Sequence, residues 1–240
     1  AHRDDLRLFV RVNGTDTGLI LDDLAAVVRA RPFGVILPKC GGGPELARLD
    51  AQLAALEVRD GIAVGTVRVL PIVTETAAAV LGTGGYASAG ARLVGMTWGG
   101  EDLAADIGAL ANRDAQGRYT EPYRLARSLT LLAATAAQVI AVDAVYIDFR
   151  DVDGLRTEAA DALRDGFTAK LAIHPDQVGP INEAFTPSAD AIERARRVIA
   201  AFEAAPGAGA VALDGRMLDR PHRRSAERVL ARAAGTGAPR

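Results

Sequence analysis

The chain has 240 residues, of which 49% are hydrophobic, and a formal net charge of −2. This length suits one large α/β domain or two small ones with a sizeable buried core, and the near-neutral charge gives no general footprint for nucleic acid. The single cysteine, Cys40, excludes an internal disulfide framework and favours a reducing, cytoplasmic compartment. The longest apolar run is too short to span a bilayer, so no membrane partner is expected.

Apolar, β-rich runs alternate with helical patterns along the first 175 residues. We predict strands at residues 6–13, 33–39, 67–74, 91–99, 143–148 and 170–175. Helices are predicted at residues 22–31, 45–61, 76–81, 101–110, 123–139 and 153–165. This alternation is typical of parallel strands joined by right-handed βαβ crossovers. The remaining tail reads as a helix over 189–205, a hairpin-like stretch over 210–218 and a helix over 222–234.

The number of strands bears on whether the sheet can close. A (β/α)8 barrel needs eight strands, and the pattern provides six. The chain begins with Ala1 rather than Met, and its opening residues run directly into a strand. Either the sheet is open or two βα units lie upstream of Ala1, and we expect the second.

In a parallel barrel the active site forms at the carboxyl ends of the strands. The polar residues found there are Arg11, Asn13, Lys39, Glu75, Glu101, Asp102, Asp148 and His174. Glu75 and Asp102 follow separate strands and could share one hard cation, with water and substrate oxygens completing the coordination. The alternative is that each carboxylate caps the helix that follows it. Asp106, one turn beyond Asp102, is expected to be structural or to support the ligands.

Two further features point to an anionic substrate. Arg11 ends a largely apolar strand and could hold a carboxylate through two parallel hydrogen bonds, or form a structural ion pair. The turn Gly99-Gly100-Glu101-Asp102 leads into a helix, where small residues let backbone N–H groups approach an anion. An ordinary tight turn remains the alternative for this segment.

Other site classes find little support. Residues 82–87 match G-x-G-x-x-A but follow a helical stretch rather than a strand, which argues against dinucleotide binding. The three histidines and Cys40 lack zinc-ligand spacing, and no G-x-S-x-G nucleophile motif is present.

Eight blocks occur in order along the chain: FVRVNG, VILPK, LPIVTET, WGGEDLAADIGA, DAVYID, GFTAKLAIHPDQV, NEAFTPS and LDGRMLDRPH. Together they resemble the citrate lyase beta-subunit-like family, within the wider group of malyl-CoA lyases and 2-oxo-acid aldolases. The similarity runs from about Leu8 to about Leu230. The I-H-P-x-Q, GGEDLAAD and D-x-P-H elements are each weak evidence for this family, and in combination they are fairly specific for it.

The resemblance implies a (β/α)8 TIM barrel over residues 1–187, with its first two βα units missing from this chain, and a C-terminal helical lid over 188–240. It implies Mg²⁺ bound by Glu75 and Asp102. Arg11 would contact the carboxylate of a 2-oxo acid, together with Gly99, Gly100 and Glu101. Lys170 and His174 would lie near the CoA side. Asp219, on the lid, would supply an acid or base to a neighbouring subunit's site in a homotrimer or hexamer.

Two features depart from the family pattern. The strand that would carry an acidic Asp-Leu-Glu-Asp motif beside the metal belongs to the absent N-terminal part. Residues 41–43 are all glycine, where relatives more often have a valine and polar helix-capping residues. That loop could alter the edge of the substrate or cofactor site.

The expected reaction is Mg²⁺-dependent cleavage of a 3-hydroxyacyl-CoA, of the citryl-, malyl- or citramalyl-CoA type, into a 2-oxo acid and an acyl-CoA. One alternative is a CoA-independent aldolase acting on a 4-hydroxy-2-oxo acid. A third possibility is a non-catalytic subunit of a lyase complex, against which the retained Arg11, Glu75, Asp102 and Asp219 argue.

Overall fold

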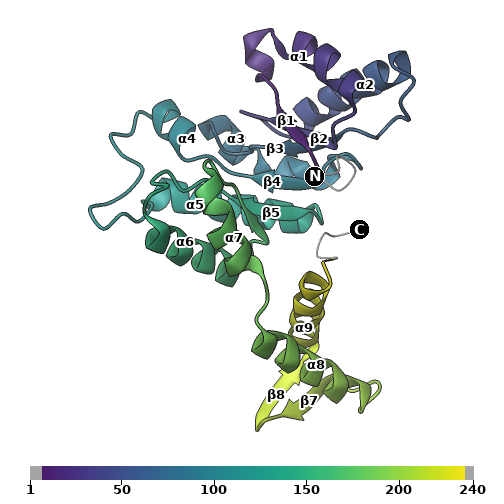
Figure 1. Ribbon diagram of the computed structural model, residues 1–240, viewed down its shortest axis with the longest axis vertical. Helices are drawn as coiled ribbons and strands as arrows, with labels where there is room; N and C mark the ends of the chain where they lie inside the picture. The colour runs from purple at the N-terminus through teal and green to yellow at the C-terminus, as the bar shows by residue number, and fades with distance from the viewer. Residues whose placement is uncertain (1–6, 236–240) are drawn as a thin grey trace.

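The computed structural model describes residues 7–235, and its main body is a curved parallel sheet covered by helices (Figure 1). The six strands are β1 (Phe9–Arg11), β2 (Gly34–Leu37), β3 (Arg68–Pro71), β4 (Gly95–Thr97), β5 (Ile140–Asp143) and β6 (Ala169–Lys170). They pair in chain order and all neighbours are parallel. Isolated parallel bridges, Val69 to Leu93 and Ile72 to Thr97, join the β1–β3 half to the β4–β6 half.

The helices of the body lie within four residues of their predicted bounds, except the last, Val178–Phe185, which was not predicted. They are α1 (Ile20–Val27), α2 (Gly43–Arg59), α3 (Ala77–Leu81), α4 (Glu101–Asp106), α5 (Glu121–Ala136), α6 (Val152–Asp165) and α7 (Val178–Phe185). Both long helices α2 and α5 have proline in the first turn. The Asp151 side chain caps α6 by accepting from Gly154 N–H, and Gly166 ends the same helix in the left-handed region with φ 117°.

The main core lies between the outer face of the sheet and the helices. The α2 side chains Leu46, Leu49 and Leu53 recur at helical spacing and are buried against it. From the strands, Val35 and Leu37 join the same cluster. Because side chains alternate across a strand, the residues between them point to the inner face of the curved sheet.

The sheet stays open. Among residues 7–235, β1 and β6 each pair with one strand only, and nothing described here joins them. The structure therefore shows six of the eight strands that a closed barrel requires. Within the same residues, no helix combines the length and apolarity needed to cross a membrane.

All six strands are shorter than predicted, and two of them also begin before their predicted bounds. The fifth was predicted at 143–148 but lies at Ile140–Asp143, directly after α5, and residues 144–148 form a loop. Gln138 takes the left-handed conformation, φ 58°, and turns the chain tightly from helix to strand. The last strand, predicted at 170–175, is only Ala169–Lys170, because His174 already begins the turn that leads into α7. Residues 139–146 are apolar except for Asp143, so the sequence contained no clear signal for the end of the fifth strand.

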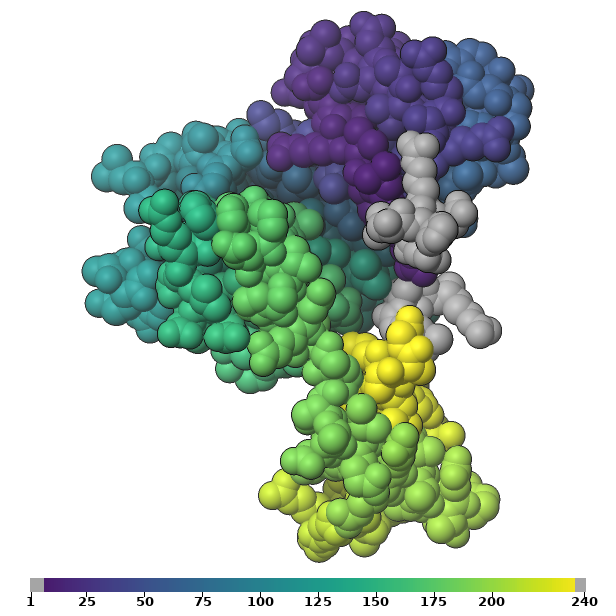
Figure 2. Space-filling model, in the orientation of Figure 1, coloured from purple at the N-terminus to yellow at the C-terminus, as the bar shows by residue number. Residues whose placement is uncertain are grey.

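A second structural unit follows residue 188. It consists of α8 (Ala189–Glu203), the antiparallel hairpin β7 (Ala210–Leu213) and β8 (Arg216–Asp219), and α9 (Arg220–Ala233). It has a small core of its own, formed by Ala195, Val198, Phe202, Leu218 and Ala226. Figures 1 and 2 show this unit projecting from the body, to which it joins through a narrow region on the face in view.

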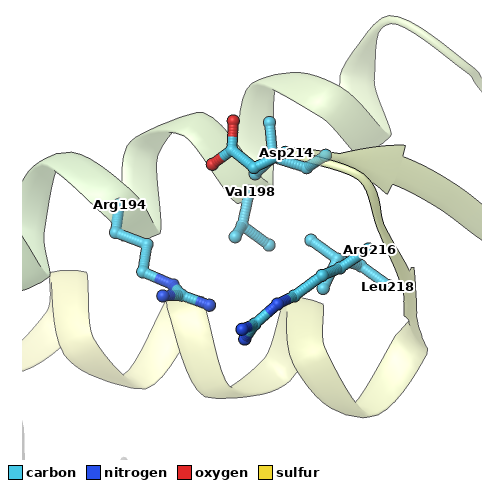
Figure 3. Close-up of a pocket in the computed structure, with 6 residues that line it drawn as sticks. Arg194, Val198, Asp214, Arg216 and Leu218 are labelled. Carbon is cyan, nitrogen blue, oxygen red and sulfur yellow. The ribbon is translucent and has the colours of Figure 1, made fainter.

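The hairpin and α8 enclose a shallow concavity (Figure 3). Arg194 and Arg216 extend over it, and Asp214, on its rim, forms an ion pair with Arg197. None of the predicted site residues lines this concavity.

A buried ion pair links α2 to the segment that enters β4. Arg92 donates two hydrogen bonds to Glu57, at 2.7 and 2.8 Å, and both side chains are almost fully buried. Glu57 also accepts from the N–H groups of Gly65 and Val67. Burial opposes ionisation of Glu57, but these donors outweigh it and hold the pKa of Glu57 below its usual value. The pair is therefore well satisfied and stays charged.

Arg92→Met should destabilise the protein by about 3–5 kcal/mol, because it leaves the Glu57 carboxylate buried without its cation. The free energy of unfolding from urea titration would measure this. Arg124→Met is the matched control, since Arg124 pairs with Glu121 on the surface, and its effect should stay within about 0.5 kcal/mol. Equal losses in the two variants would contradict a special role for the buried pair.

Candidate active site

Glu75 lies where β3 continues toward the carboxyl end of the sheet. The segment after Pro71 stays attached to β4, since Val73 N–H donates to the carbonyl of Thr97. This attachment delivers Glu75 beside the turn that follows β4, and its side chain is buried to 4% exposure. One oxygen, Oε2, accepts a hydrogen bond from the backbone N–H of Lys39, at the end of β2. Three adjacent strand ends therefore converge on one carboxylate.

Gly99 gives this carboxylate its room. A Cβ at position 99 would stand 2.9 Å from Cγ of Glu75, closer than packed atoms tolerate. The Gly99 N–H points to the Thr74 hydroxyl, 3.3 Å away, so it contributes to the turn rather than standing free. The glycine pair predicted to approach substrate thus has an additional task, which is to let the β4 turn pack on Glu75.

Asp102, in the first turn of α4, completes the pair. Its carboxylate interacts with Glu75, and its Oδ1 lies 3.6 Å from the ammonium nitrogen of Lys39. Burial raises the pKa of Glu75 above its usual value, the Lys39 N–H partly offsets this, and the neighbouring Asp102 raises it further. Arg11 is close enough to act in the opposite direction.

The helix-capping alternative for Glu75 can now be decided. Helix α3 is capped by Thr76, whose hydroxyl accepts from Ala79 N–H. Asp106 accepts from Ala77 N–H at 2.7 Å, so it serves the same helix end and has the structural role expected of it. Glu75 contributes to neither bond. At α4 the N-cap position is Gly100, which has no side chain to cap the helix. Glu75 is therefore left for another partner, whereas Asp102, in the first turn of α4, also suits the helix dipole there.

The pair suits a hard divalent cation. Buried Glu75 has no cation in ion-pair contact among residues 7–235, the neighbouring Asp102 adds a second negative charge, and carboxylate oxygens are the donors that Mg²⁺ prefers. Within residues 7–235, no cluster of three or more His, Cys, Asp or Glu side chains could hold a metal, so this part of the chain would offer the two carboxylates.

Arg11, at the end of β1, has its guanidinium exposed. Across residues 7–235, it takes part in no hydrogen bond or ion pair that would explain it structurally. The alternative of an ion pair with a neighbouring strand end therefore finds no support. Asn13 differs, because its backbone N–H and side-chain amide both donate to Asp23, which fixes the loop before α1.

Glu101 is engaged within the loop that follows α4. Its Oε1 accepts from the side-chain amide of Asn112 at 2.5 Å. Gly100 lies against Tyr119 and Trp98, whose rings meet edge to face with centroids 4.9 Å apart. The turn is thus held by loop 107–120, and a direct contact of Glu101 with substrate stays a prediction.

Lys170 requires a correction. It was predicted to bind substrate, but its side chain is fully buried in an ion-pair cluster on the outer face of β6. Its ammonium donates to Asp143 at 3.0 Å, to Glu158 of α6 at 2.7 Å and to the carbonyl of Ala144 at 2.8 Å. Three donors with three partners leave none for a ligand. The strand alternation that turns Lys170 toward α6 is the physical reason.

Asp143 holds this cluster together. It also accepts from Trp98 Nε1 at 2.8 Å and from Arg127 of α5 at 3.0 Å. Burial opposes its ionisation, but Lys170 and Arg127 outweigh burial and lower the pKa of Asp143. The cluster joins β5, β6, α5 and α6 and is structural.

His174 has a structural task and a partly exposed ring. Its Nδ1 accepts from Asp176 N–H, which caps the turn before α7, and its ring stacks on Phe149 with centroids 4.5 Å apart. Gln177 completes the I-H-P-x-Q element by accepting from His174 N–H and donating to the carbonyl of Tyr146. A contact of His174 with CoA stays a prediction.

Asp219 lies at the end of β8, away from the carboxylate pair. Its Oδ1 is 2.6 Å from Nδ1 of His222 at the start of α9, and both side chains are about half exposed. Figure 1 places β8 at the far end of the molecule from α3 and α4, which begin beside Glu75 and Asp102. Within one chain, Asp219 therefore does not join the pair.

Two features singled out in the sequence prove to be one packing contact. The triglycine loop 41–43 lies against residues 82–85, which enter the short 3₁₀ helix Thr83–Ser88. A Cβ on Gly43 would collide with the carbonyl oxygen of Gly85. The G-x-G-x-x-A match is thus not a strand-to-helix turn. Cys40, beside this loop, is buried, and burial raises its pKa to about 11, so it is no nucleophile.

Lys39 is the site residue that sequence reasoning left unassigned. Its position at a predicted strand end was the available signal, but only the structure shows that it contacts both Glu75 and Asp102.

The chain matches two family models and several known proteins. Residues 1–175 match the family model described as HpcH/HpaI aldolase/citrate lyase, and residues 120–238 match a model for C–C bond lyases of the TIM-barrel fold. A citrate lyase subunit beta-like protein of Mycobacterium tuberculosis is 39% identical over 231 residues, covering 96% of this chain and 77% of the relative. The mitochondrial citramalyl-CoA lyase of Mus musculus is 34% identical over 233 residues, covering 92% of this chain and 67% of the relative.

Among solved structures, the Mycobacterium tuberculosis protein CitE in complex with magnesium, acetoacetate and coenzyme A superposes with a TM-score of 0.75 at 37% identity. The match covers 94% of this chain and 78% of that one.

The raised pKa of Glu75 predicts how stability depends on pH. A carboxyl group whose pKa is higher in the folded than in the unfolded state stabilises the fold while protonated, and this contribution is lost as pH rises through the folded value. In metal-free protein at neutral pH, Glu75→Gln should therefore be more stable than wild type by about 1–2 kcal/mol. Below about pH 4 the two proteins should converge, because Glu75 is then protonated in both states. Urea unfolding in EDTA at both pH values measures this, and a destabilised Glu75→Gln at neutral pH would contradict it.

Proposed function

Because this chain belongs to the HpcH/HpaI aldolase/citrate lyase family, whose members include carbon–carbon lyases, we propose that it is a Mg²⁺-dependent lyase acting on a 3-hydroxyacyl-CoA. The substrate would be of the citryl-, malyl- or citramalyl-CoA type, and the products a 2-oxo acid and an acyl-CoA. The observation that carries the proposal is the carboxylate pair Glu75–Asp102, of which Glu75 is buried and only Asp102 has a cation, Lys39, in ion-pair contact, with the exposed Arg11 close by.

Glu75 and Asp102 would hold the metal. Bound there, Mg²⁺ would supply a Lewis acid that polarises the carbon–oxygen bond that becomes the ketone. The two carboxylates come from rigid strand ends, and Gly99 lets them approach each other, so the site is preorganised.

Arg11 would hold the carboxylate of the acid half. Its planar guanidinium can donate two parallel hydrogen bonds, which fixes both the position and the plane of the carboxylate. Gly99, Gly100 and Glu101 line the same turn and would limit where the acid can lie. This alignment places the breaking C–C bond relative to the metal ligands.

The reaction needs a base that accepts the hydroxyl proton and an acid that protonates the carbon. Cleavage removes the proton of the hydroxyl group and leaves the α-carbon of the acyl-CoA to be protonated, so the reaction conserves protons overall. Asp219 is the candidate for the carbon end, and in the condensing direction it would remove the same proton. Its half-exposed carboxylate, on a unit that projects from the body, suits a site on another subunit.

The proposal also covers how the barrel closes and how the subunits assemble. Two further βα units would complete the barrel between β6 and β1, whose outer edges are unpaired among residues 7–235. The unit from residue 188 onward would act as a lid on a neighbouring subunit, in a trimer or a hexamer with closed symmetry. His174 would face the CoA side. We place the protein in the cytoplasm, where its unpaired Cys40 would remain reduced.

Asp102→Asn should abolish both Mg²⁺ binding and cleavage, because the amide removes one anionic ligand while keeping the side-chain shape. The assay follows 2-oxo acid and acyl-CoA from citryl-, malyl- and citramalyl-CoA, with Mg²⁺ or EDTA.

In the same assay, Arg11→Met should mainly raise KM, about 10-fold to 100-fold, because it removes a binding contact.

Failure of the wild-type enzyme on all three esters would overturn the lyase proposal. Pyruvate release from a CoA-free 4-hydroxy-2-oxo acid would favour the aldolase alternative. Failure to bind Mg²⁺ at millimolar concentration would favour a non-catalytic subunit.

Mixing two inactive variants tests lid exchange. Asp102→Asn and Asp219→Asn subunits each carry one intact half of the proposed composite site. After unfolding together in equal amounts and refolding, about a quarter of the sites should pair a wild-type metal pair with a wild-type lid, if the lid serves a neighbour. Regained activity near that fraction supports exchange. No activity above the separate variants, in oligomers of normal size, would show that the lid does not serve another subunit.

A further inference from the structure

Lys39 contacts both members of the carboxylate pair, each in a different way. Its backbone N–H donates to Oε2 of Glu75, and its ammonium nitrogen lies 3.6 Å from Oδ1 of Asp102. The residue stands at the end of β2 with φ 52°, in the left-handed region that a side chain with a Cβ seldom adopts. This conformation lets one residue address both carboxylates.

The charges around the pair make the ammonium significant. Glu75 is buried and Asp102 about half exposed, and two like charges this close destabilise each other. Among residues 7–235, Lys39 provides the cation in ion-pair contact with the pair, while Arg11 acts from further away. The ammonium thus stands where a metal ion bound by Asp102 would need room.

We propose that Lys39 is a resident counter-cation of the metal site, which neutralises Asp102 in the metal-free protein and gives up that position when a divalent cation binds. The inference rests on the proposed function, because it requires that Glu75 and Asp102 bind the metal. An ammonium and a divalent cation repel each other, so metal binding must break the ion pair. Lys39 therefore weakens metal affinity while it protects the metal-free site.

The long side chain makes this exchange feasible. The Lys39 side chain is 44% exposed, so after leaving Asp102 the ammonium can turn to solvent without being buried. Lys170 provides the contrast, since its ammonium is buried with three partners and has no freedom to leave. The two lysines thus differ in accessibility, and only Lys39 can respond to a metal ion.

The test compares Mg²⁺ affinity in the EDTA-stripped full chain by titration calorimetry at low salt. Lys39→Met keeps the side-chain length and a Cβ at the same φ, but removes the charge. It should bind Mg²⁺ about three- to tenfold more tightly than wild type, because no ion pair is broken and no cation is repelled. Lys39→Arg keeps the charge and should stay within about twofold of wild type. Arg124→Met, which removes an exposed cation paired with Glu121, is the control for net charge.

Two further readouts separate this role from a purely structural one. The rise in Tm on adding Mg²⁺ should be larger for Lys39→Met than for wild type. The substitution removes the ion pair with Asp102 from the metal-free protein, whereas in metal-loaded wild type that pair is already broken. The affinity difference should shrink at about 0.5 M salt, where charges at this exposure are screened.

The outcomes are distinguishable. If wild type binds Mg²⁺ and Lys39→Met binds it equally or less tightly, the counter-cation role is wrong and the proposed function stands. If wild type binds no Mg²⁺ at millimolar concentration, the proposed metal site fails, and this inference fails with it.

Discussion

A carboxylate that is removed from water controls the arrangement of the strand ends. Glu75 is 4% exposed, and burial alone favours its protonated form. Its neighbours are placed in relation to that charge. The β4 turn comes close because position 99 has no side chain, and the backbone of Lys39 bends into the left-handed region to donate a hydrogen bond. Asp102 then adds a second negative charge, which only a cation can balance.

The Glu75–Asp102 pair differs from the other charged clusters because its carboxylates have fewer hydrogen-bond and ion-pair partners. Arg92 and Glu57 form two mutual hydrogen bonds, and Glu57 has backbone donors as well. The Lys170–Asp143 cluster has a partner for each ammonium hydrogen. Such groups hold helices on the sheet and have no capacity left for a ligand. Glu75 keeps unused oxygen lone pairs in a place where water is limited, and half-exposed Asp102 stands beside it, an arrangement that suits metal ligands.

The structural ion-pair cluster and the carboxylate pair occupy different parts of the sheet. Lys170 and Asp143 point outward to α5 and α6, where the contacts are closed on all sides. Glu75 lies at the carboxyl end of the strands, where the turns after β3 and β4 leave the chain open. The C-terminal unit, with a core of its own, carries Asp219 away from this place. A site that needs Asp219 would therefore need a second chain.

The sequence by itself determined the alternation of strands and helices, because apolar periodicity records which face of each segment is buried. It also located Glu75, Asp102 and Arg11, since polar residues at the ends of apolar strands indicate the mouth of a parallel sheet. It could not determine where β5 ends, because residues 139–146 are almost uninterruptedly apolar and contain no local stop.

Tertiary structure decided the rest. The direction of the Lys170 side chain depends on strand register, which a single apolar run does not reveal. The lysine that was predicted to bind substrate is therefore part of a buried, structural ion-pair cluster. The capping question at Glu75 was decided by Thr76 and Asp106, the second of which lies 29 residues beyond its partner Ala77. The role of Lys39 depends on contacts with carboxylates 36 and 63 residues along the chain, which only the parallel pairing of β2, β3 and β4 brings within reach.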